Sequence, residues 1–473
     1  MAPRYRVLAS QIAGDIENGL LQAGNKLPGL RHISKQHDVS LSTAMAAYRY
    51  LEREQYIEAR PRSGFYIKPR FENEIESPRL SHPDSTPKLV SNQQRVMQVI
   101  SASNQPGMLR LGATVPDASF LPVASLERAL SAAARHPYGR NHNYDFPPGY
   151  IGLRKELAKR MNQLGCRVHH DEIMITQGCQ EALFLALKVC CKAGDVVALE
   201  SPVFYGLLQI IDTLGLQALE IPTDPKQGIS LEALQLAVEK WPVKACVVIT
   251  NFSNPTGASL SSERKKTLVD MLARNNIPLI EDDIYGDLSF ATQRPGVAKQ
   301  YDNSGNNLYC SSLSKTLSPS LRIGWIAGGS YIEELNYQKF TANAANATLP
   351  QLAAERLLIS GEYDRHLHRM RAAAASSMSR IREHLAKYMP AGTRITQPQG
   401  GYTLWIELAE NIDTLKLAEK ALAENISIAA GPLFSASDKY KNCFRVSCAL
   451  PWNEEIDNGL RRLGALAHSL SLS

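Results

Sequence analysis

Short apolar runs that end in polar residues recur through the C-terminal part of the chain. Val196–Glu200, Ala245–Thr250, Ile277–Ile280 and Leu308–Cys310 each have the length and composition of a buried strand. Together they predict an α/β domain with a parallel sheet. Ligands of such sheets bind beyond the carboxyl ends of the strands, so the residues that follow these runs are candidates for a functional site.

The polar residues at these strand ends carry different chemical groups. Asn254 follows one run, Asp282 and Tyr285 follow the next, and Lys315 lies in a serine-rich turn between two runs. Arg322 comes seven residues after this lysine. An amine among hydroxyls, with a guanidinium nearby, suits an aldehyde that also carries a phosphate. Taken alone, the turn could equally be a solvated loop with an ordinary surface lysine.

A second candidate turn follows the apolar run at residues 173–176. There Gly178 precedes a predicted helix that begins at Cys179 and Gln180. Glycine lets the backbone approach a ligand closely, and the amides at the start of a helix can hold a phosphate.

These segments resemble, in the same order, the signatures of fold type I pyridoxal-phosphate (PLP) enzymes, the aspartate aminotransferase superfamily. The resemblance implies a mostly parallel seven-stranded sheet with a small α+β C-terminal domain. It also implies that Lys315 forms a Schiff base with PLP, that Asp282 pairs with the pyridine nitrogen, and that Asn254 and Tyr285 bond the ring hydroxyl. The further cofactor contacts that it implies are Gly178, Cys179, Gln180, Phe204, Ser312, Ser314 and Arg322.

Three more residues gain a role through this resemblance. Phe204 would stack on the cofactor ring, with Tyr205 as the alternative and core packing as the simpler interpretation of either. Arg445 would bind a substrate α-carboxylate, because a guanidinium can form a bidentate pair. Tyr144 would reach the phosphate in the partner subunit, which implies a homodimer, although a plain turn tyrosine is an alternative.

The N-terminal segment has a different pattern. Apolar residues at helical spacing predict a helix from Tyr5 to Ile16, a short helix over Leu30–Gln36 and a third over Ser42–Glu54. Two short apolar runs, at residues 56–57 and 65–67, then flank a basic, glycine-containing turn. Three helices followed by such a hairpin predict a winged helix-turn-helix.

This segment resembles the GntR family of DNA-binding domains, through Leu27-Pro28, Val39-Ser40, Ala47-Tyr48 and Gly64-Phe65-Tyr66. Gly29 and Leu41 depart from that family, which usually has a capping serine and often a basic residue there. The resemblance implies contacts to double-stranded DNA: Ser42, Thr43 and Arg49 in the major groove, and Arg31 and Arg62 on phosphates or the minor groove. A protein-interaction module is the alternative.

Charge supports a division into domains. Residues 1–70 hold eleven Lys or Arg against six Asp or Glu, whereas the whole chain of 473 residues has a formal charge of +6. We therefore expect a DNA-binding domain over residues 1–69 and an aminotransferase-like domain over 101–473, with its small subdomain at roughly 341–473. A proline-rich stretch within residues 70–100 predicts an extended linker.

Other classes of site find less support. The eight cysteines lack paired metal spacing, which favours buried thiols in a cytoplasmic protein. We expect no metal site, because His169-His170, His32 with His37, and His366 with His368 have no evident acidic or cysteine partners and fit surface or helix positions. Apolar runs of strand length predict no membrane span and no secretory signal.

The combination of a GntR-like winged helix, a linker and an aminotransferase-like domain resembles the MocR subfamily of PLP-dependent transcriptional regulators. The resemblance implies a homodimeric regulator that senses an amino-acid-like or vitamin B6 ligand. The sequence leaves two alternatives open: a working aminotransferase with a DNA-binding appendage, which performs either full turnover or half-reactions only, and a cofactor-free dimerisation scaffold. The sequence does not identify the effector, the operator or the sign of regulation.

Overall fold

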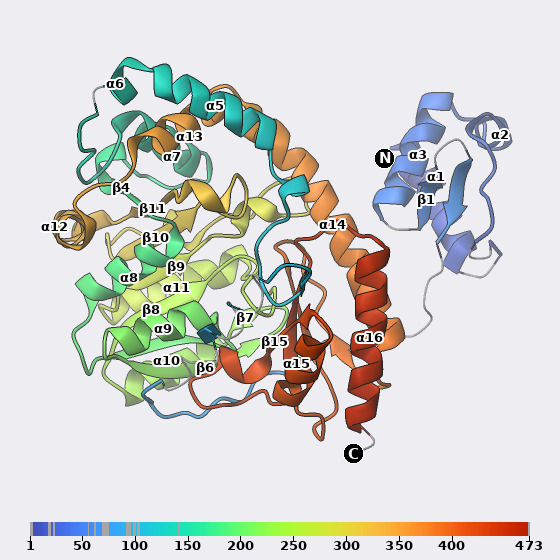
Figure 1. Ribbon diagram of the computed structural model, residues 1–473. Coiled ribbons are helices and arrows are strands. Elements are labelled where there is room, and N and C mark those ends of the chain that lie inside the picture. Colours follow the sequence, from blue (N-terminus) through green and yellow to red (C-terminus); the bar gives the residue numbers. More distant parts are fainter. Residues whose placement is uncertain are drawn as a thin grey trace. The chain divides into compact units, whose positions relative to one another are not determined.

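The chain forms two compact units, residues 1–74 and 75–473, in the computed structural model (Figure 1). The structure describes residues 3–17, 20–21, 24–54, 56–60, 63–68, 75–90, 96–97, 101, 105–140 and 142–471.

The first unit is the predicted winged helix-turn-helix. Its elements are α1 (Arg4–Glu17), α2 (Leu30–Gln36), α3 (Leu41–Arg53) and the antiparallel pair β1 (Ile57–Arg60) and β2 (Gly64–Ile67). Leu8, Ile12, Tyr48 and Leu51 meet in its core, as their helical spacing requires. The Ser40 hydroxyl caps α3 by accepting the Thr43 N–H at 3.1 Å.

The second unit is built on a mixed sheet that is mostly parallel. Among the described residues its strands are, in spatial order, β4 (Ile173–Thr176), β11 (Gly324–Ala327), β10 (Asn307–Ser312), β9 (Leu279–Asp282), β8 (Val243–Ile249), β5 (Val196–Ser201), β6 (Gln217–Asp224) and β7 (Gly228–Ile229). β11 runs antiparallel to both its neighbours. The expected seven strands are present, and the two-residue β7 adds an antiparallel edge.

Helices cover both faces of this sheet (Figure 1), so its strands read as continuous apolar runs. One face packs on α8 (Cys179–Cys190), α9 (Tyr205–Thr213) and α12 (Ile332–Asn343). The other packs on α5 (Val123–Arg135), α7 (Ile151–Gln163), α10 (Leu231–Lys240), α11 (Ser262–Arg274) and α13 (Thr348–Ile359), and the short α6 (Pro137–Arg140) follows α5.

The small subdomain follows the long helix α14 (Glu362–Tyr388). Its antiparallel sheet has the order β12 (Arg394–Ile395), β13 (Thr403–Glu407), β16 (Cys443–Ser447), β15 (Ala429–Ala430). α15 (Thr414–Ala423), α16 (Glu454–Ser471) and the pair β14 (Ile426–Ser427) and β3 (Leu109–Arg110) complete it. α13 packs on α5 and α7 beside the large sheet, whereas α14 packs on α16 of the small subdomain.

Residues 75–90, here called the strap, were expected to belong to a spacer but lie against the second unit. The Lys88 backbone pairs with Ala218 of β6, and the Ser81 hydroxyl accepts the Thr223 N–H at 2.7 Å. At the other end, the Glu76 carbonyl accepts the Ile395 N–H at 3.0 Å. The strap is therefore fixed to both the large sheet and the small subdomain.

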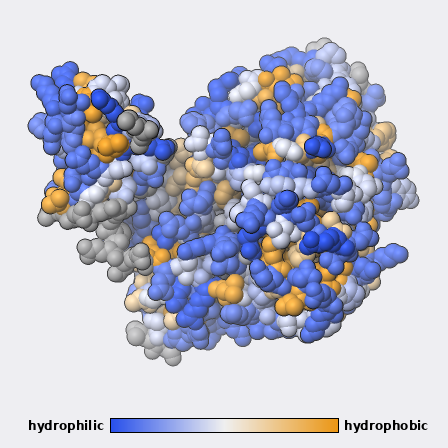
Figure 2. All heavy atoms as spheres, turned by 180° about the vertical axis from the view of Figure 1, so that it is seen from behind, coloured by the Kyte–Doolittle hydropathy of each residue, from blue (hydrophilic) through white to orange (hydrophobic). Residues whose placement is uncertain are grey.

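The surface of the molecule seen from behind is mostly hydrophilic, with apolar side chains in small separate groups (Figure 2). Among the described residues, no helix combines the length and the apolar character that crossing a bilayer would require.

Candidate cofactor site

Lys315 lies in the turn between β10 and β11, as predicted. The Ser312 hydroxyl shapes this turn by donating to the Ile323 carbonyl at 2.8 Å and accepting the Ser314 N–H at 3.0 Å. The Lys315 ammonium donates to the Thr114 carbonyl at 2.6 Å. Burial, helped by the positive charges of Arg445 and Arg322, lowers the pKa of Lys315 to about 8. This lysine is therefore far easier to deprotonate than an ordinary one.

Asp282 ends β9, beside the strand that leads to Lys315. Its Oδ1 accepts the Ile284 N–H at 3.1 Å and the Cys179 thiol at 3.4 Å. Burial raises the pKa of Asp282 to about 6, and these two hydrogen bonds oppose that rise. The Cys179 side chain thus supports Asp282, a role that its position in a phosphate-binding turn does not indicate.

Arg445, on β16, is fully buried without an acidic partner among the described residues. Its Nη1 donates to Asn254 Oδ1 at 3.0 Å and its Nη2 to the Gly112 carbonyl, while its Nε has no partner there. The rings of Tyr205 and Phe434 flank the guanidinium at 5.7 and 5.1 Å. A buried cation with a free donor is prepared for an anionic ligand.

Asn254 links this arginine to Tyr285, because its Nδ2 donates to the Tyr285 hydroxyl at 3.5 Å. Burial raises the pKa of Tyr285 to about 12, so the phenol stays protonated at neutral pH.

The turn before α8 brings Gly178 against Arg322. Gly178 has φ +83°, and a Cβ there would lie 2.7 Å from Nη2 of Arg322. Arg322 itself has a left-handed backbone, with φ 55°, and donates to the Gln177 carbonyl at 2.5 Å. A helix start and a guanidinium therefore converge, as a phosphate requires.

These groups surround one cavity of about 130 Å³. Its walls are Thr114, Cys179, Gln180, Leu183, Phe204, Ile249, Asn254, Asp282, Ile284, Tyr285, Ser314, Lys315 and Arg322. Gly178, Ser312 and Arg445 are not among these residues, but each adjoins one of them: Gly178 lies against Arg322, Ser312 bonds Ser314 and Arg445 bonds Asn254. Phe204 faces the cavity, whereas Tyr205 packs against Arg445 and Phe434. Tyr144 is 74% exposed and stacks on Phe146 with ring centroids 5.4 Å apart.

The donor set fits pyridoxal phosphate. It offers an amine of lowered pKa for an aldehyde, a carboxylate for a pyridine nitrogen, and a phenol for a ring hydroxyl. The glycine turn with Arg322 supplies the cradle for a phosphate. No group in the set conflicts with that cofactor.

Some contributors were not predicted. Leu183, Ile249 and Ile284 line the cavity but are ordinary apolar residues in sequence. Tyr402 donates its hydroxyl to the Lys315 carbonyl at 3.2 Å. His366, expected at a surface or helix position, lies on helix α14, where it is 3% exposed and bonds the Thr316 carbonyl.

The expected DNA contacts occupy accessible positions on the first unit. Arg31 on α2 and Ser42 and Arg49 on α3 are exposed, and Thr43 is partly exposed. Gly29, the residue before α2, gives this helix no side-chain cap, in keeping with its departure from the GntR pattern. Arg62 lies outside the described residues.

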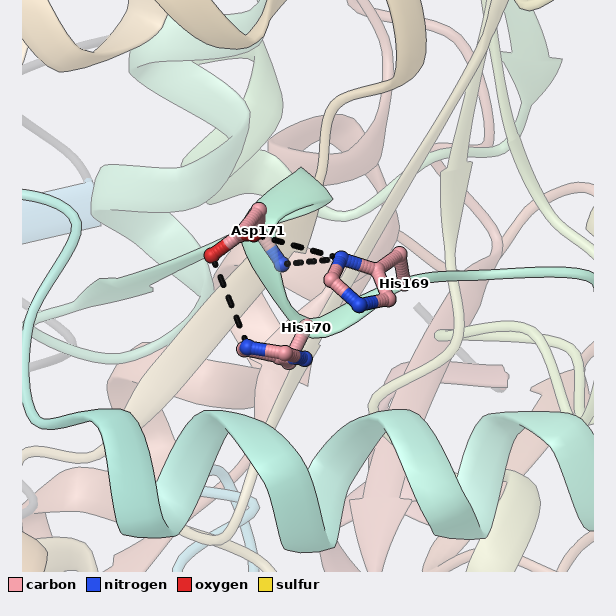
Figure 3. A group of neighbouring side chains, drawn as sticks. All are labelled: His169, His170 and Asp171. Atoms are coloured by element: carbon pink, nitrogen blue, oxygen red, sulfur yellow. Dashed lines mark hydrogen bonds and ion pairs between the residues drawn. The ribbon is translucent and has the colours of Figure 1, made fainter.

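His169 and His170 do have an acidic neighbour, contrary to expectation. The Asp171 carboxylate lies 3.3 Å from Nδ1 of His169 and 3.6 Å from Nε2 of His170 (Figure 3). Arg154 donates to the same carboxylate at 3.2 Å. Because His169 also caps the short turn at His170–Glu172, this group has a structural explanation.

Comparisons with known proteins agree with both halves of the chain. Residues 108–463 match the aminotransferase class I and II family, and residues 4–67 match the bacterial regulatory proteins of the gntR family. The chain is 37% identical to the uncharacterized HTH-type transcriptional regulator YjiR of Escherichia coli K12, over 98% of each chain. The chain belongs to the MocR-like transcriptional regulators.

In this MocR-like regulator the aminotransferase part has the fold of the enzymes. The chain is 25% identical to the multiple substrate aminotransferase of Thermococcus profundus, with a TM-score of 0.75, covering 81% of this chain and 96% of that one. It is 27% identical to the α-aminoadipate aminotransferase LysN of Thermus thermophilus, with a TM-score of 0.73, covering 81% and 100%. The GntR-type domain implies DNA binding, and the aminotransferase family implies pyridoxal phosphate as the cofactor.

Proposed function

We propose that this MocR-like regulator binds pyridoxal phosphate at Lys315 and changes its binding to operator DNA when an amino-acid-like or vitamin B6 ligand enters the cavity. The observation that carries the proposal is the pairing, in one site, of an activated lysine with Arg445, a buried arginine that lacks a carboxylate partner among the described residues. The first would hold an aldehyde, and the second would hold a ligand carboxylate.

Each side chain has a defined task in this proposal. When bound, pyridoxal phosphate supplies an aldehyde carbon and an electron-withdrawing ring. Lys315 attaches the cofactor through its neutral amine. Asp282 orients and charges the pyridine nitrogen, Asn254 and Tyr285 fix the ring edge, and Phe204 covers one ring face and excludes water. Cys179, Gln180, Ser314 and Arg322 hold the phosphate.

We further propose a homodimer, with the regulator acting in the cytoplasm. Tyr144, Phe146 and Phe340 form an aromatic cluster in which the rings are 74%, 52% and 53% exposed. Aromatic side chains exposed together are typical of a protein interface. A second copy would cover them and would bring Tyr144 toward the partner's phosphate. Analytical ultracentrifugation should show a dimer, and Phe340→Glu should weaken it.

A working aminotransferase is the second candidate, favoured by the completeness of the residue set around the cavity. A turnover assay with amino donors and keto acids separates the two. Sustained exchange over many cycles would support the enzyme. A reaction that stops after one half-turnover, while DNA affinity changes, would support the regulator.

The direct test is electrophoretic binding to the DNA upstream of the chain's own or a neighbouring coding region. Binding should be sequence-preferring and should change when pyridoxal phosphate or candidate amines are added, because a ligand must favour one conformation to shift it. Cofactor uptake without preference for any duplex would contradict the proposal.

A further inference from the structure

Helix α14 packs against the turn that carries Lys315 and forms hydrogen bonds with it. The carbonyl of Thr316, the next residue, lies 2.7 Å from Nε2 of His366. The Thr316 hydroxyl shares a hydrogen bond with the Tyr363 hydroxyl at 2.8 Å. Both α14 side chains are buried, at 1% exposure for Tyr363 and 3% for His366. Neither contact is needed to complete the cavity wall.

The protonation of these two groups is fixed by their surroundings. Burial lowers the pKa of His366, so the imidazole is neutral at neutral pH. A carbonyl can only accept, so the proton of that neutral ring must sit on Nε2. Burial likewise raises the pKa of Tyr363, and its phenol donates to Asp287 Oδ2 at 2.9 Å.

Asp287 extends the connection to the strand end that carries Asp282. Its carboxylate pairs with Arg294 at 2.6 Å, and Arg294 also pairs with Asp283, the neighbour of Asp282. Arg371, one turn further along α14, donates to the Asp287 carbonyl at 2.6 Å. These buried groups form one connected network of ion pairs and hydrogen bonds, which restricts the movement of each member.

α14 also reaches the small subdomain. It packs on α16, and the Ser377 hydroxyl donates to the Leu450 carbonyl at 2.5 Å. Tyr402, beside β13, bonds the Lys315 carbonyl directly. Side chains from α14 and from Tyr402, the residue before β13 of the small subdomain, therefore both bond the lysine turn.

We propose that Tyr363 and His366 are positioning residues that fix the Lys315 turn and tie its state to helix α14. This inference rests on the proposed function, in which Lys315 carries the cofactor. Attachment and release at the lysine would move the turn, and the hydrogen bonds through Thr316 would pass that movement to α14 and the small subdomain.

The test compares three variants with the natural chain. Tyr363→Phe with His366→Leu removes both hydrogen-bonding groups, and His366→Gln keeps a donor. His368→Leu is the matched control, because His368 is exposed on the same helix. Thermal melting followed by circular dichroism confirms that each protein is folded. Should the double variant fail to fold, Tyr363→Phe alone removes one oxygen atom and takes its place.

Two measurements are made on each protein. Borohydride trapping and peptide mass analysis give the rate at which pyridoxal phosphate attaches to Lys315. Hydrogen–deuterium exchange of the cofactor-free protein reports opening of the turn, since the amides of Thr316 and Leu317 donate to the Leu313 carbonyl at 3.3 and 2.8 Å.

The double variant should exchange faster in this turn and should attach the cofactor about tenfold more slowly, because the amine is less well positioned. His366→Gln should retain most of the natural attachment rate and of the natural protection of the turn amides. His368→Leu should change neither quantity. Natural rates and protection in the double variant would overturn the inference. If the natural chain attaches no cofactor, the proposed function fails. The exchange data then still test whether Tyr363 and His366 hold the turn in place.

Discussion

At the scale of single residues, the proposed attachment of the cofactor to Lys315 can be tested directly. Lys315→Ala should abolish the yellow absorption that attached pyridoxal phosphate produces, because the amine is the point of attachment. Absorption spectroscopy after gel filtration measures this. Lys188→Ala, at an exposed lysine of α8, is the control. Persistence of the band in Lys315→Ala would refute the assignment.

The acidity of that lysine predicts a pH dependence. With a pKa of about 8, roughly one Lys315 in ten is neutral at pH 7, and the neutral fraction rises as the proton leaves. The rate of cofactor attachment should therefore increase with pH around a midpoint near 8. The positive charge of Arg445 lowers this pKa, so Arg445→Gln should move the midpoint upward. An unmoved midpoint would show that the guanidinium does not act on the lysine.

Polar residues were predictable where they follow strands and were not predictable inside helices. Asn254, Asp282 and Lys315 could be selected because apolar runs end at them. Tyr363 and His366 lie in a long helix with many charged residues, where a side chain that faces the core resembles one that faces water. Their role depends on which turn packs against the helix, and a single sequence does not show that.

At the scale of elements, Gly178 in the turn before α8 and Gly194 in the turn before β5 have similar backbone angles but different surroundings. Gly178→Ala would place a methyl group 2.7 Å from the Arg322 guanidinium at φ +83°. Gly194→Ala, at φ +90°, would meet nothing within 4 Å. Each should lose about 1–3 kcal/mol of unfolding free energy through backbone strain.

The cofactor affinity should separate these two variants. Gly178→Ala should weaken it at least tenfold, or by about 1.4 kcal/mol, because Arg322 is displaced. Gly194→Ala should retain it. Urea denaturation and fluorescence titration measure the two quantities. Equal losses of affinity in both variants would assign the effect to strain alone.

Element boundaries were predictable to within a few residues where buried runs are short. The predicted strand at residues 196–200 is observed as Val196–Ser201, and the short helix at 30–36 is observed with the same bounds. The two-residue β7 has too little sequence to carry a pattern. The strap was predicted as part of a spacer because its sequence has no apolar periodicity. Its contacts with the second unit are mainly backbone and polar hydrogen bonds, which leave no such pattern.

At the scale of the whole molecule, DNA binding should divide into positioning and reading contacts. Arg31→Ala should weaken binding to all duplexes and reduce the slope of log affinity against log salt by about one, since one phosphate contact is lost. Thr43→Ala should instead alter preference at particular base positions. Fluorescence anisotropy over a salt series measures both. A loss confined to one base position for Arg31→Ala would contradict its role.

Because the strap is fixed to the second unit, it also limits the length of the chain that connects this unit to the DNA-binding domain. Six residues lie between Lys68, the last described residue of the DNA-binding domain, and Ile75, so the seven Cα–Cα steps can span at most about 25 Å. A free spacer over residues 70–100 could have reached about 100 Å. A dimer with such short connecting segments should bind operators only over a narrow range of distances between the two half-sites. Inserting a glycine-serine segment after Lys68 should widen that range in a binding assay with variably spaced operators, and an unchanged range would show that something other than tether length sets the spacing.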